Sequence, residues 1–353
     1  MELRYLGDTG LKVSAFCMGT MTFGERWEER LGSFGQETAS EMVDRCLDAG
    51  INFFDTANVY SYGEAERILG KALGTRRKDA VIATKVRMRM PDEGHPNDEG
   101  LSRWHIIRQC EESLDRLGTD WIDLYQVHAW DPATPLDETL RALDDLVRSG
   151  KVRYIGASNY TAWQLAKALW TSDVGGYARF ETLQALYNLT NRDIEHELVP
   201  LCEDQRLGIL PWSPLAQGFL TGKYRRDSRP DGGRMSDGPS SLLRFEEEAY
   251  YDLIDLMEEI AGDRGVTIPQ VALNWLRARP AVVSVILGAR TIQQLEENLM
   301  AARWELRGEE ADRLDDVTRP SARYPQHMID RVSRYRRRRG LNRYREVPRD
   351  QGE

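Results

Sequence analysis

A carboxylate and a phenol follow one short apolar stretch near the start of the chain. Residues 51–54 are apolar enough to form a buried strand, Asp55 follows them directly, and Tyr60 comes shortly after. Taken singly, an Asp in this place is most often a helix cap, and a Tyr most often an amphipathic surface residue. Together they favour chemistry, because a charged group at the end of a buried strand adds little to stability and a phenol can donate a proton.

Two further predicted strands end in a basic side chain. Lys85 follows the residues VIAT, and His128 follows LYQV. An unpaired buried ammonium is costly, so Lys85 needs a partner, and Asp55 is within reach. An ammonium roughly 4 Å from a phenol, at an effective dielectric constant of about 20, contributes about 4 kcal/mol, or about three pKa units, of which Asp55 offsets part. We therefore expect Tyr60 to exchange a proton near neutral pH, as carbonyl reduction requires.

Polar and aromatic side chains also stand at the ends of later apolar stretches. Ser158 and Asn159 end one stretch, Gln184 lies in the next, and Trp212 ends the one after. Their amide and hydroxyl groups could bind a carboxamide, and the indole could stack on a nicotinamide ring. Because a proton donor needs a hydride source to reduce a carbonyl, these residues favour a nicotinamide cofactor.

An anion site is predicted after the last apolar stretch. Gly288 and Ala289 expose backbone N–H groups where a helix is expected to begin, and Arg290 stands beside them. Barrel enzymes often bind phosphate at this place in the fold. The pattern therefore fits the phosphate end of the same cofactor.

The scaffold that must position these residues is an alternation of apolar and amphipathic stretches. Predicted strands cover 15–19, 51–54, 80–84, 121–127, 152–157, 182–186, 208–212 and 282–287. The helices that follow them cover 39–49, 64–73, 102–117, 136–149, 161–171, 197–205, 244–261 and 291–303. Eight such pairs predict an α/β fold, a closed (β/α)8 TIM barrel, with long loops at its C-terminal face.

The barrel is expected to carry additions at both ends of the chain. Residues 3–14 predict a β-hairpin, and 269–278 and 308–317 predict accessory helices. A doubly wound sheet is the alternative architecture, but it would need a Gly-rich turn after its first strand, and no G-x-G-x-x-G occurs in the chain. In the barrel, the second, third and fourth strands are neighbours, so Asp55, Lys85 and His128 should converge, with Tyr60 above them.

Composition narrows the class of protein. Four cysteines stand far apart without a C-x-x-C, which argues for reduced thiols, a cytoplasmic setting and no metal site. The first residues carry charge where a secretory signal would be apolar, and the longest apolar run, 281–289, is too short to span a membrane.

Charge is distributed unevenly along the chain. The net charge is −9, but residues 331–353 hold nine arginines against three acids, so residues 1–330 carry −15. A body this acidic repels nucleic acid. We predict a domain over 1–330 and an arginine-rich tail over 331–353, solvated and partly disordered or docked on an acidic surface.

Several of these motifs, in this order, resemble the aldo-keto reductase superfamily. The likeness covers about residues 3–318 and rests on RYLGDTGLKVS, GINFFDTANVYSYGEAE, TKV, DLYQVH, GKVRYIGASN, LQALYN, PWSPLAQGFLTGKY and GARTIQQLEEN. The loops look most similar to the bacterial branch related to aryl-alcohol dehydrogenases and to potassium-channel β subunits. The resemblance implies NAD(P)H-dependent reduction of small-molecule aldehydes or ketones, reversible toward alcohols.

Roles for individual residues follow from the resemblance. Tyr60 would be the general acid, Asp55 and Lys85 would tune it, and His128 would orient the carbonyl. Cofactor binding would fall to Gly19, Thr20, Met21, Asp55, Ser158, Asn159, Gln184, Trp212, Ser213, Leu215, Gly218, Lys223, Gly288, Arg290, Gln294, Glu297 and Asn298. Many members hold a Lys where Gly288 stands and an Arg where Gln294 stands, so Arg290 is the cation left in that segment, and it favours NADP over NAD.

Two readings of the whole protein stay open from the sequence. The first is an NADPH-dependent reductase whose substrate pocket uses Phe23, Trp27 and Trp130, an aromatic rim suited to planar carbonyls or to a keto sugar. The second is a nucleotide-binding, redox-sensing interaction protein in which turnover is incidental. The physiological carbonyl, a homo-oligomeric state and the role of the tail are open in both readings.

Overall fold

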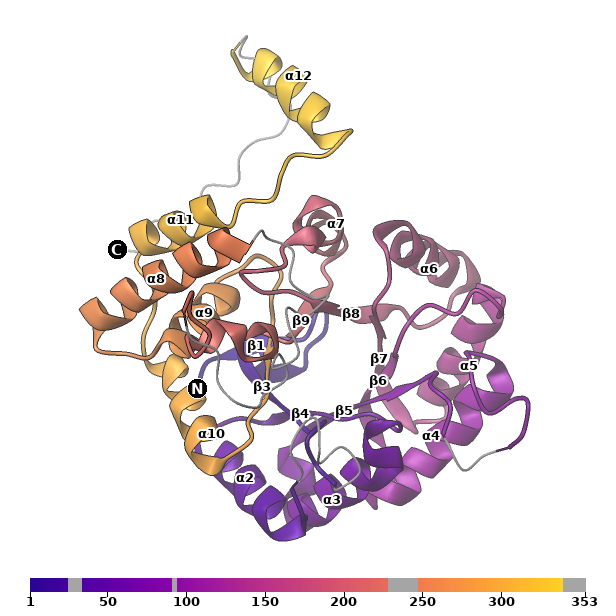
Figure 1. The fold of residues 1–353 in the computed structure, drawn as a ribbon. Helices are drawn as coiled ribbons and strands as arrows, with labels where there is room; N and C mark the ends of the chain where they lie inside the picture. Colours follow the sequence, from indigo (N-terminus) through magenta and orange to yellow (C-terminus); the bar gives the residue numbers. More distant parts are fainter. Residues whose placement is uncertain (25–33, 91–93, 228–246, 339–353) are drawn as a thin grey trace. The chain divides into compact units, whose positions relative to one another are not determined.

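Eight parallel strands form the centre of the protein, as seen end-on in Figure 1. The computed structural model describes residues 1–24, 34–90, 94–227 and 247–338. The strands are β3 (Phe16–Gly19), β4 (Phe53–Asp55), β5 (Val81–Val86), β6 (Ile122–Val127), β7 (Val152–Ser158), β8 (Phe180–Leu186), β9 (Gly208–Trp212) and β10 (Val285–Leu287). They pair in the order β10-β3-β4-β5-β6-β7-β8-β9.

The barrel is closed by the residues just before β10. The Ile209 N–H donates to the Ala281 carbonyl at 2.7 Å, and the Val283 N–H donates to the Ile209 carbonyl at 3.0 Å. These bonds join β9 to the segment that enters β10. The predicted TIM barrel is therefore confirmed, and the predicted last strand, 282–287, divides into this bridging segment and the shorter β10.

Helices surround the strands, and the main helix after each strand lies on the outside of the barrel (Figure 1). Eight of them are α2 (Gln36–Asp48), α3 (Glu64–Leu73), α4 (Arg103–Leu117), α5 (Leu136–Arg148), α6 (Ala162–Gly175), α7 (Leu198–Gln205), α8 (Glu247–Arg264) and α10 (Ile292–Leu299). Two accessory helices are α9 (Ile268–Arg277) and α11 (Gly308–Val317). Their positions agree with the predicted stretches to within a few residues.

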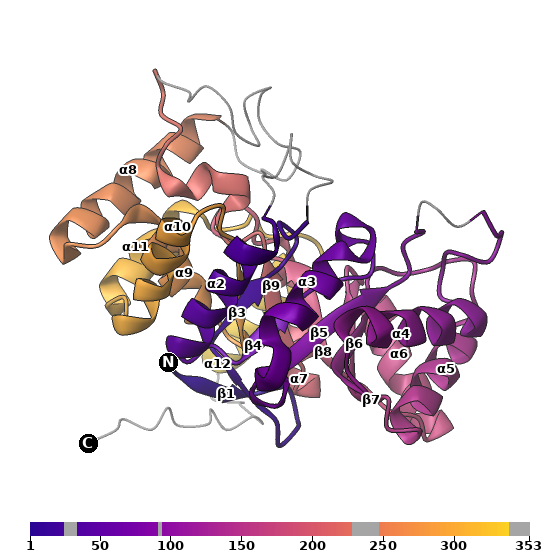
Figure 2. The same ribbon diagram turned by 90° about the horizontal axis from the view of Figure 1, so that it is seen from below.

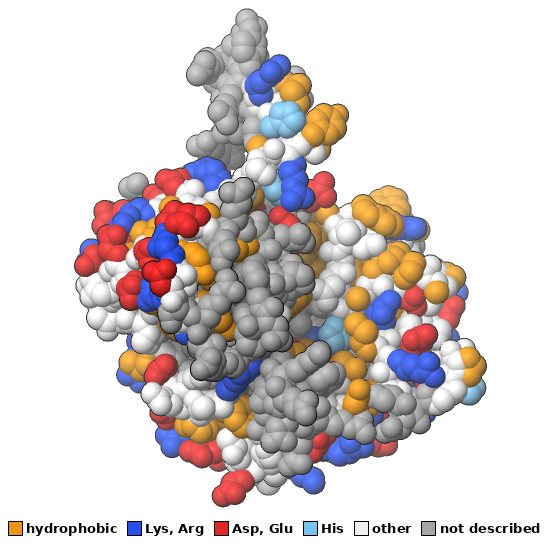
Figure 3. All heavy atoms as spheres, in the orientation of Figure 1, with side chains coloured by type: hydrophobic (Ala, Val, Ile, Leu, Met, Phe, Trp, Pro, Cys, Tyr) orange, Lys and Arg blue, Asp and Glu red, His pale blue; other side chains and the backbone are white. Residues whose placement is uncertain are grey.

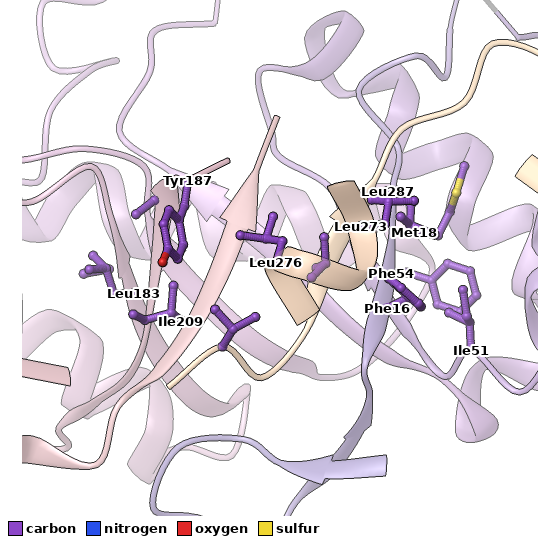
Figure 4. Packing of buried hydrophobic residues seen from close by; sticks show 14 of the residues in the cluster. Phe16, Met18, Ile51, Phe54, Leu183, Tyr187, Ile209, Leu273, Leu276 and Leu287 are labelled. Carbon is purple, nitrogen blue, oxygen red and sulfur yellow. The ribbon is translucent and has the colours of Figure 1, made fainter. Parts of the chain in front are cut away.

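The main hydrophobic layer lies between the strands and the helices. Figure 4 shows Leu273 and Leu276 of α9 between Ile209 of β9 and the residues of β3 and β10. All of these side chains are almost completely buried. At roughly 1.5–3 kcal/mol for each fully buried large apolar side chain, this layer fixes the accessory helix firmly to the barrel.

A β-hairpin covers the N-terminal end of the barrel, below the strands in Figure 2. Its strands β1 (Leu3–Tyr5) and β2 (Lys12–Ser14) are antiparallel. Leu6 and Val13 are fully buried in a second cluster inside the barrel. Gly7 has φ +60°, and a Cβ there would come within 2.3 Å of the Glu181 carbonyl oxygen, so this turn needs glycine. The hairpin therefore packs into this end of the barrel and covers it.

The surface differs between helices. Hydrophobic side chains gather over α6 in Figure 3, where Trp163, Trp170 and Val174 are exposed. Charged side chains of both signs gather over α8 and α11 in the same view. No helix among the described residues is long and apolar enough to cross a membrane.

The chain divides into two units, residues 1–318 and 319–353. The first holds the barrel and ends just after α11. The second contains helix α12 (Gln326–Arg338), which includes the first eight residues of the predicted arginine-rich tail. The remaining residues of that tail, 339–353, lie outside the described part of the chain.

Candidate active site

The four predicted catalytic residues lie together at the C-terminal ends of β4, β5 and β6. Asp55 ends β4, Lys85 lies one residue before the end of β5, and His128 directly follows β6. The Lys85 Nζ donates to Asp55 Oδ1 at 2.6 Å and to the Tyr60 Oη at 3.3 Å. The rings of Tyr60 and His128 meet edge to face, with centroids 6.0 Å apart. The convergence expected from strand order is what the structure shows.

A tight turn after β4 positions Tyr60. Tyr60 begins the short 3-10 helix η1 (Tyr60–Gly63), in which Ser61 and Tyr62 have φ of 44° and 54°. The Ser61 Oγ donates to the Phe23 carbonyl at 2.9 Å, which fixes the turn against the loop after β3. Left-handed backbone at non-glycine residues costs of order 1–3 kcal/mol and concentrates at functional sites. This strained turn holds the phenol of Tyr60 over the end of β5.

Asp55 and Lys85 form a buried ion pair, and each of the three N–H donors of the lysine has a hydrogen-bond partner. Their side chains are 4% and 0% exposed. The third Lys85 donor goes to the Thr56 carbonyl at 2.7 Å. The other carboxylate oxygen of Asp55 accepts from Gln184 Nε2 at 2.8 Å and from Gln126 Nε2 at 3.3 Å. Because both charges are saturated by partners, the pair can persist in a site from which water is excluded.

Burial is the largest single influence on the pKa of Lys85 and of His128, but it decides the direction of the shift only at His128. Burial by itself would lower the pKa of Lys85, but Asp55 and Tyr60 outweigh it, and the net pKa lies above the ordinary value. Burial, followed by the positive charges of Lys85 and Arg87, lowers the pKa of His128 to about 3. The lysine is therefore an ammonium and the histidine a neutral imidazole at physiological pH.

The pKa of Tyr60 corrects one expectation from the sequence. Burial raises the pKa of the phenol above its ordinary value, and Asp55 adds to that rise, whereas the ammonium of Lys85 only partly opposes it. The electrostatic argument from the sequence counted the ammonium but left out the cost of ionising a buried phenol. At physiological pH, Tyr60 is therefore a phenol that keeps its proton, which suits a general acid.

A cavity of about 810 Å³ opens above these residues at the C-terminal ends of the strands. Its lining includes Gly19, Met21, Asp55, Tyr60, His128, Ser158, Asn159, Gln184, Trp212, Ser213, Leu215, Gly218, Lys223, Gly288, Arg290, Gln294, Glu297 and Asn298. All of these are residues singled out from the sequence. Its volume is in the range of small-molecule and cofactor sites.

The wall next to His128 is a linked set of amide, hydroxyl and indole groups. The Asn159 Nδ2 donates to the His128 carbonyl at 2.9 Å and to Ser158 Oγ at 3.1 Å. The Trp212 Nε1 donates to Asn159 Oδ1 at 3.3 Å. Gln184 donates one amide N–H to Asp55, so its second N–H and its oxygen are left to meet a ligand. These fixed polar groups beside an indole suit a nicotinamide carboxamide.

The wall after β9 has an unusual backbone. Ser213, Ala216 and Gln217 have φ of 55°, 47° and 57°, and Gly218 has φ 96°. A Cβ at Gly218 would lie 3.3 Å from the Lys223 Nζ, so the bare backbone leaves that ammonium room at the cavity wall. A positive side chain beside an open backbone is what a phosphate needs.

The wall after β10 is the start of α10. The Thr291 Oγ accepts from the Gln294 N–H, the Gln294 side chain accepts from the Arg290 N–H at 2.9 Å, and the Asn298 Nδ2 donates to the Gly288 carbonyl at 3.4 Å. Nothing lies within 4 Å of where a Gly288 Cβ would stand. The segment is thus braced by its own side chains, and its backbone at Gly288 faces open space. Together with Lys223, these groups fit the phosphates of a dinucleotide.

Some predicted residues do not line the cavity. Thr20 is fully buried and donates to the Asp55 carbonyl, and Lys85 lies beneath the cavity floor. Phe23 is completely buried in the hydrophobic core. Trp130 packs edge-on against Tyr160 and Trp163 and does not line the cavity. The predicted aromatic rim is therefore not found at these two positions, because both rings are used in packing; Trp27 lies outside the described residues.

Other residues of the site were not singled out from the sequence. Gln126 bonds Asp55 from inside the barrel, and the cavity is also lined by Thr22, Pro214, Gln217, Thr221, Thr267, Ile268, Pro269, Ile286 and Leu287. The one available signal was the PWSPLAQGFLTGKY segment, which contains three of them. Within the described residues, no group of three His, Cys, Asp or Glu side chains could hold a metal ion.

Comparison with known proteins gives a consistent result. A family model described as the Aldo/keto reductase family matches residues 15–319. The chain is 40% identical over 327 residues to an uncharacterized oxidoreductase of Bacillus subtilis (strain 168), covering 90% of this chain and 96% of that protein. It is 34% identical over 346 residues to the versiconal hemiacetal acetate reductase of Aspergillus parasiticus, covering 92% and 99%. It is also 37% identical over 313 residues to a probable voltage-gated potassium channel subunit beta of Arabidopsis thaliana, covering 85% and 91%.

Proposed function

The chain belongs to the aldo/keto reductase family, and from this premise we propose that it is an NADPH-dependent reductase of aldehydes or ketones. The observation that carries the proposal is the buried series Asp55–Lys85–Tyr60, which ends in a protonated phenol at the floor of a large cavity. A redox enzyme that also needs a proton requires such a donor next to the reacting carbonyl.

The residues present fit the cofactor. Trp212, Asn159 and Ser158 form the wall for the nicotinamide end, and Lys223, Gly288 and Arg290 form the wall for the phosphate end of the same cavity. When bound, NADPH supplies a hydride to the carbonyl carbon. The chain's own groups then have to bind the carbonyl oxygen and deliver one proton.

Three side chains share that task. Tyr60 donates its hydroxyl proton to the carbonyl oxygen as the carbon accepts the hydride, which gives the alcohol and leaves a phenolate. The Lys85 ammonium, 3.3 Å from the Tyr60 oxygen, stabilises that phenolate, and Asp55 holds the ammonium in place. Neutral His128 offers an N–H to the carbonyl oxygen and orients it toward Tyr60.

The direct test is turnover of a panel of aldehydes and ketones by the purified full-length protein with NADPH. We expect NADPH consumption that depends on the carbonyl and is matched by an equal amount of alcohol. A folded protein that binds NADPH but reduces no member of the panel would argue against the reductase.

Arg290 is our candidate for recognising the 2′-phosphate of NADPH. It lines the cavity next to the start of α10. Loss of a charge-assisted hydrogen bond costs about 1.5–3 kcal/mol. Arg290→Ala should therefore weaken NADPH binding roughly tenfold to a hundredfold and leave NADH binding almost unchanged, as measured by fluorescence titration.

A matched control exists on the same segment. Arg303→Ala removes the same charge from an exposed position after α10, outside the cavity. It should leave both affinities as they are. Equal weakening of NADPH and NADH binding by Arg290→Ala would show that Arg290 does not select the 2′-phosphate.

A second candidate function is a nucleotide-binding interaction protein whose turnover is incidental. Two observations favour it: similarity to proteins named as potassium channel β subunits, and the exposed face of α6 with Trp163, Trp170 and Val174. Exposed aromatic residues of this kind are typical of protein interfaces. The panel separates the two functions, because tight NADPH binding without turnover is the result expected of the second.

A further inference from the structure

Arg87 directly follows β5, two residues after Lys85; it does not line the cavity itself, but its positive charge acts on His128 of the candidate active site. Ala83 packs inside the barrel and Lys85 bonds Asp55 and Tyr60 at its mouth, and Arg87 is the next residue of this alternating series. Two residues that follow the adjacent strand β6, His128 and Trp130, contact the backbone or side chain of this segment. The His128 N–H donates to the Val86 carbonyl at 2.9 Å, and the Arg87 Nε donates to the Trp130 carbonyl at 3.1 Å.

The guanidinium of Arg87 is partly buried and forms no ion pair within 4 Å with an acid among the described residues. Its remaining contact is a weak one, from Nη1 to the Met88 sulfur at 3.8 Å. Asp131, the acid of the facing loop, accepts from the N–H groups of Leu101 and Ala133 and from the hydroxyl of Thr134, and the positive charge of Arg87 also acts on its carboxylate. Arginine has five N–H donors, and most of those of Arg87 have no hydrogen-bond partner among the described residues.

The backbone of Arg87 is also strained. Its φ is 135°, a conformation that side chains other than glycine rarely adopt. The conformation is imposed on both sides, since the Gly100 N–H donates to the Arg87 carbonyl at 2.9 Å while Nε is held by Trp130. Strain of this kind persists where the surroundings enforce it, most often at ligand sites.

We propose that Arg87 is a substrate-binding residue, which holds the carboxylate or phosphate of an anionic aldehyde or ketone while its carbonyl lies between Tyr60 and His128. This inference rests on the proposed reductase function and adds a substrate class to it. Arg87 has N–H donors without a partner among the described residues, and bidentate binding of an oxyanion requires such donors. A purely structural role would need only the Nε bond to Trp130, and it leaves the remaining N–H donors without a function.

Matched pairs of substrates test the proposal. 4-Carboxybenzaldehyde is compared with 4-methylbenzaldehyde, and glyceraldehyde 3-phosphate with glyceraldehyde, so that the two pairs separate a carboxylate from a phosphate. In Arg87→Met, kcat/KM for the anionic member of at least one pair should fall roughly tenfold to a hundredfold. The neutral members should change little. Arg87→Lys keeps the charge and should restore part of the difference.

The control variant is Arg89→Met, which removes the same charge from an exposed position two residues further on. Arg89→Met should leave the preference for anionic substrates unchanged. If kcat/KM for the anionic substrates fell equally in Arg89→Met, the effect would be a general attraction by positive charge, and the proposal would be wrong. An equal fall for the anionic and neutral substrates in Arg87→Met would show a structural role, and it too would overturn the proposal.

A binding measurement keeps this inference separate from the reductase function. Benzoate and inorganic phosphate are titrated into the protein by calorimetry, with and without NADPH. At least one anion should bind the native protein and bind Arg87→Met at least about tenfold more weakly. If the native protein reduces no aldehyde, the reductase proposal fails, yet anion binding still decides the role of Arg87. Unchanged binding of both anions in Arg87→Met would refute the proposed role of Arg87.

Discussion

Phenylalanine in place of Tyr60 is expected to lower kcat for carbonyl reduction by at least about 10², with NADPH affinity retained. The substitution removes only the hydroxyl. The ring still packs edge-on against His128 and still lies 4.8 Å from the Lys85 Nζ. What is lost is the one group at the cavity floor that can protonate the carbonyl oxygen as the hydride arrives.

The neighbouring Tyr62 provides the control for this variant. It belongs to the same turn, η1, but does not line the cavity. Tyr62→Phe also loses one hydroxyl and should keep a rate close to that of the native protein. Stopped-flow measurement of single turnovers, with NADPH affinity measured separately, isolates the chemical step. A native-like rate in Tyr60→Phe would remove Tyr60 from the mechanism.

The raised pKa of Tyr60 adds a pH dependence with a definite sign. A general acid works while it is protonated, and burial raises the pKa of this phenol above its ordinary value of about 10. The rate of reduction should therefore stay level from neutral pH upward and fall only as the pH rises through the raised pKa. A fall with a midpoint near neutral pH would instead support the lower pKa expected from the sequence.

The scaffold and the four central residues could be predicted because both depend on order along the chain. Alternating apolar and amphipathic stretches are sufficient to indicate parallel strands, and parallel strands place their C-terminal ends on one rim. Asp55, Lys85 and His128 each follow an apolar stretch closely, so adjacency of their strands brings them together. No knowledge of loop shape is needed for this step.

Residues whose roles depend on closure of the barrel could not be found in the same way. Gln126 lies two residues before His128 and reads as an ordinary strand residue. The strand register places it opposite Lys85, from where it bonds Asp55. Its role is set by the contents of the barrel interior, which a linear pattern does not report.

Loop and accessory residues escaped prediction for a related reason. Thr267, Ile268 and Pro269 line the cavity because α9 packs against the barrel, far along the chain from the catalytic residues. Phe23 follows the first strand as a rim residue should, yet the loop turns its ring into the core. Such positions are decided by side-chain packing over several elements, not by local sequence.

Lys85→Met is expected to lower the free energy of unfolding by about 3–5 kcal/mol, because it leaves the carboxylate of Asp55 buried without its counter-charge. Catalysis should be lost in parallel, since the phenolate of Tyr60 would no longer be stabilised. Urea unfolding, read by circular dichroism, measures the stability. Lys151→Met is the control: the side chains of Lys151 and its partner Glu111 are 41% and 45% exposed, and surface pairs of this kind contribute at most about 1 kcal/mol.

A double-mutant cycle decides whether the loss comes from the unpaired charge or from the lost packing of a long side chain. Asp55→Asn keeps an oxygen that can accept from Gln184 and removes the negative charge. If the charge is responsible, the variant with both Asp55→Asn and Lys85→Met should be more stable than Lys85→Met alone, with a coupling energy of at least about 1 kcal/mol. Additive losses would mean that Lys85 contributes mainly volume, and the pair would then be explained by packing alone. Activity should remain low in the double variant in either case, because a stable floor without the ammonium still cannot hold the phenolate of Tyr60.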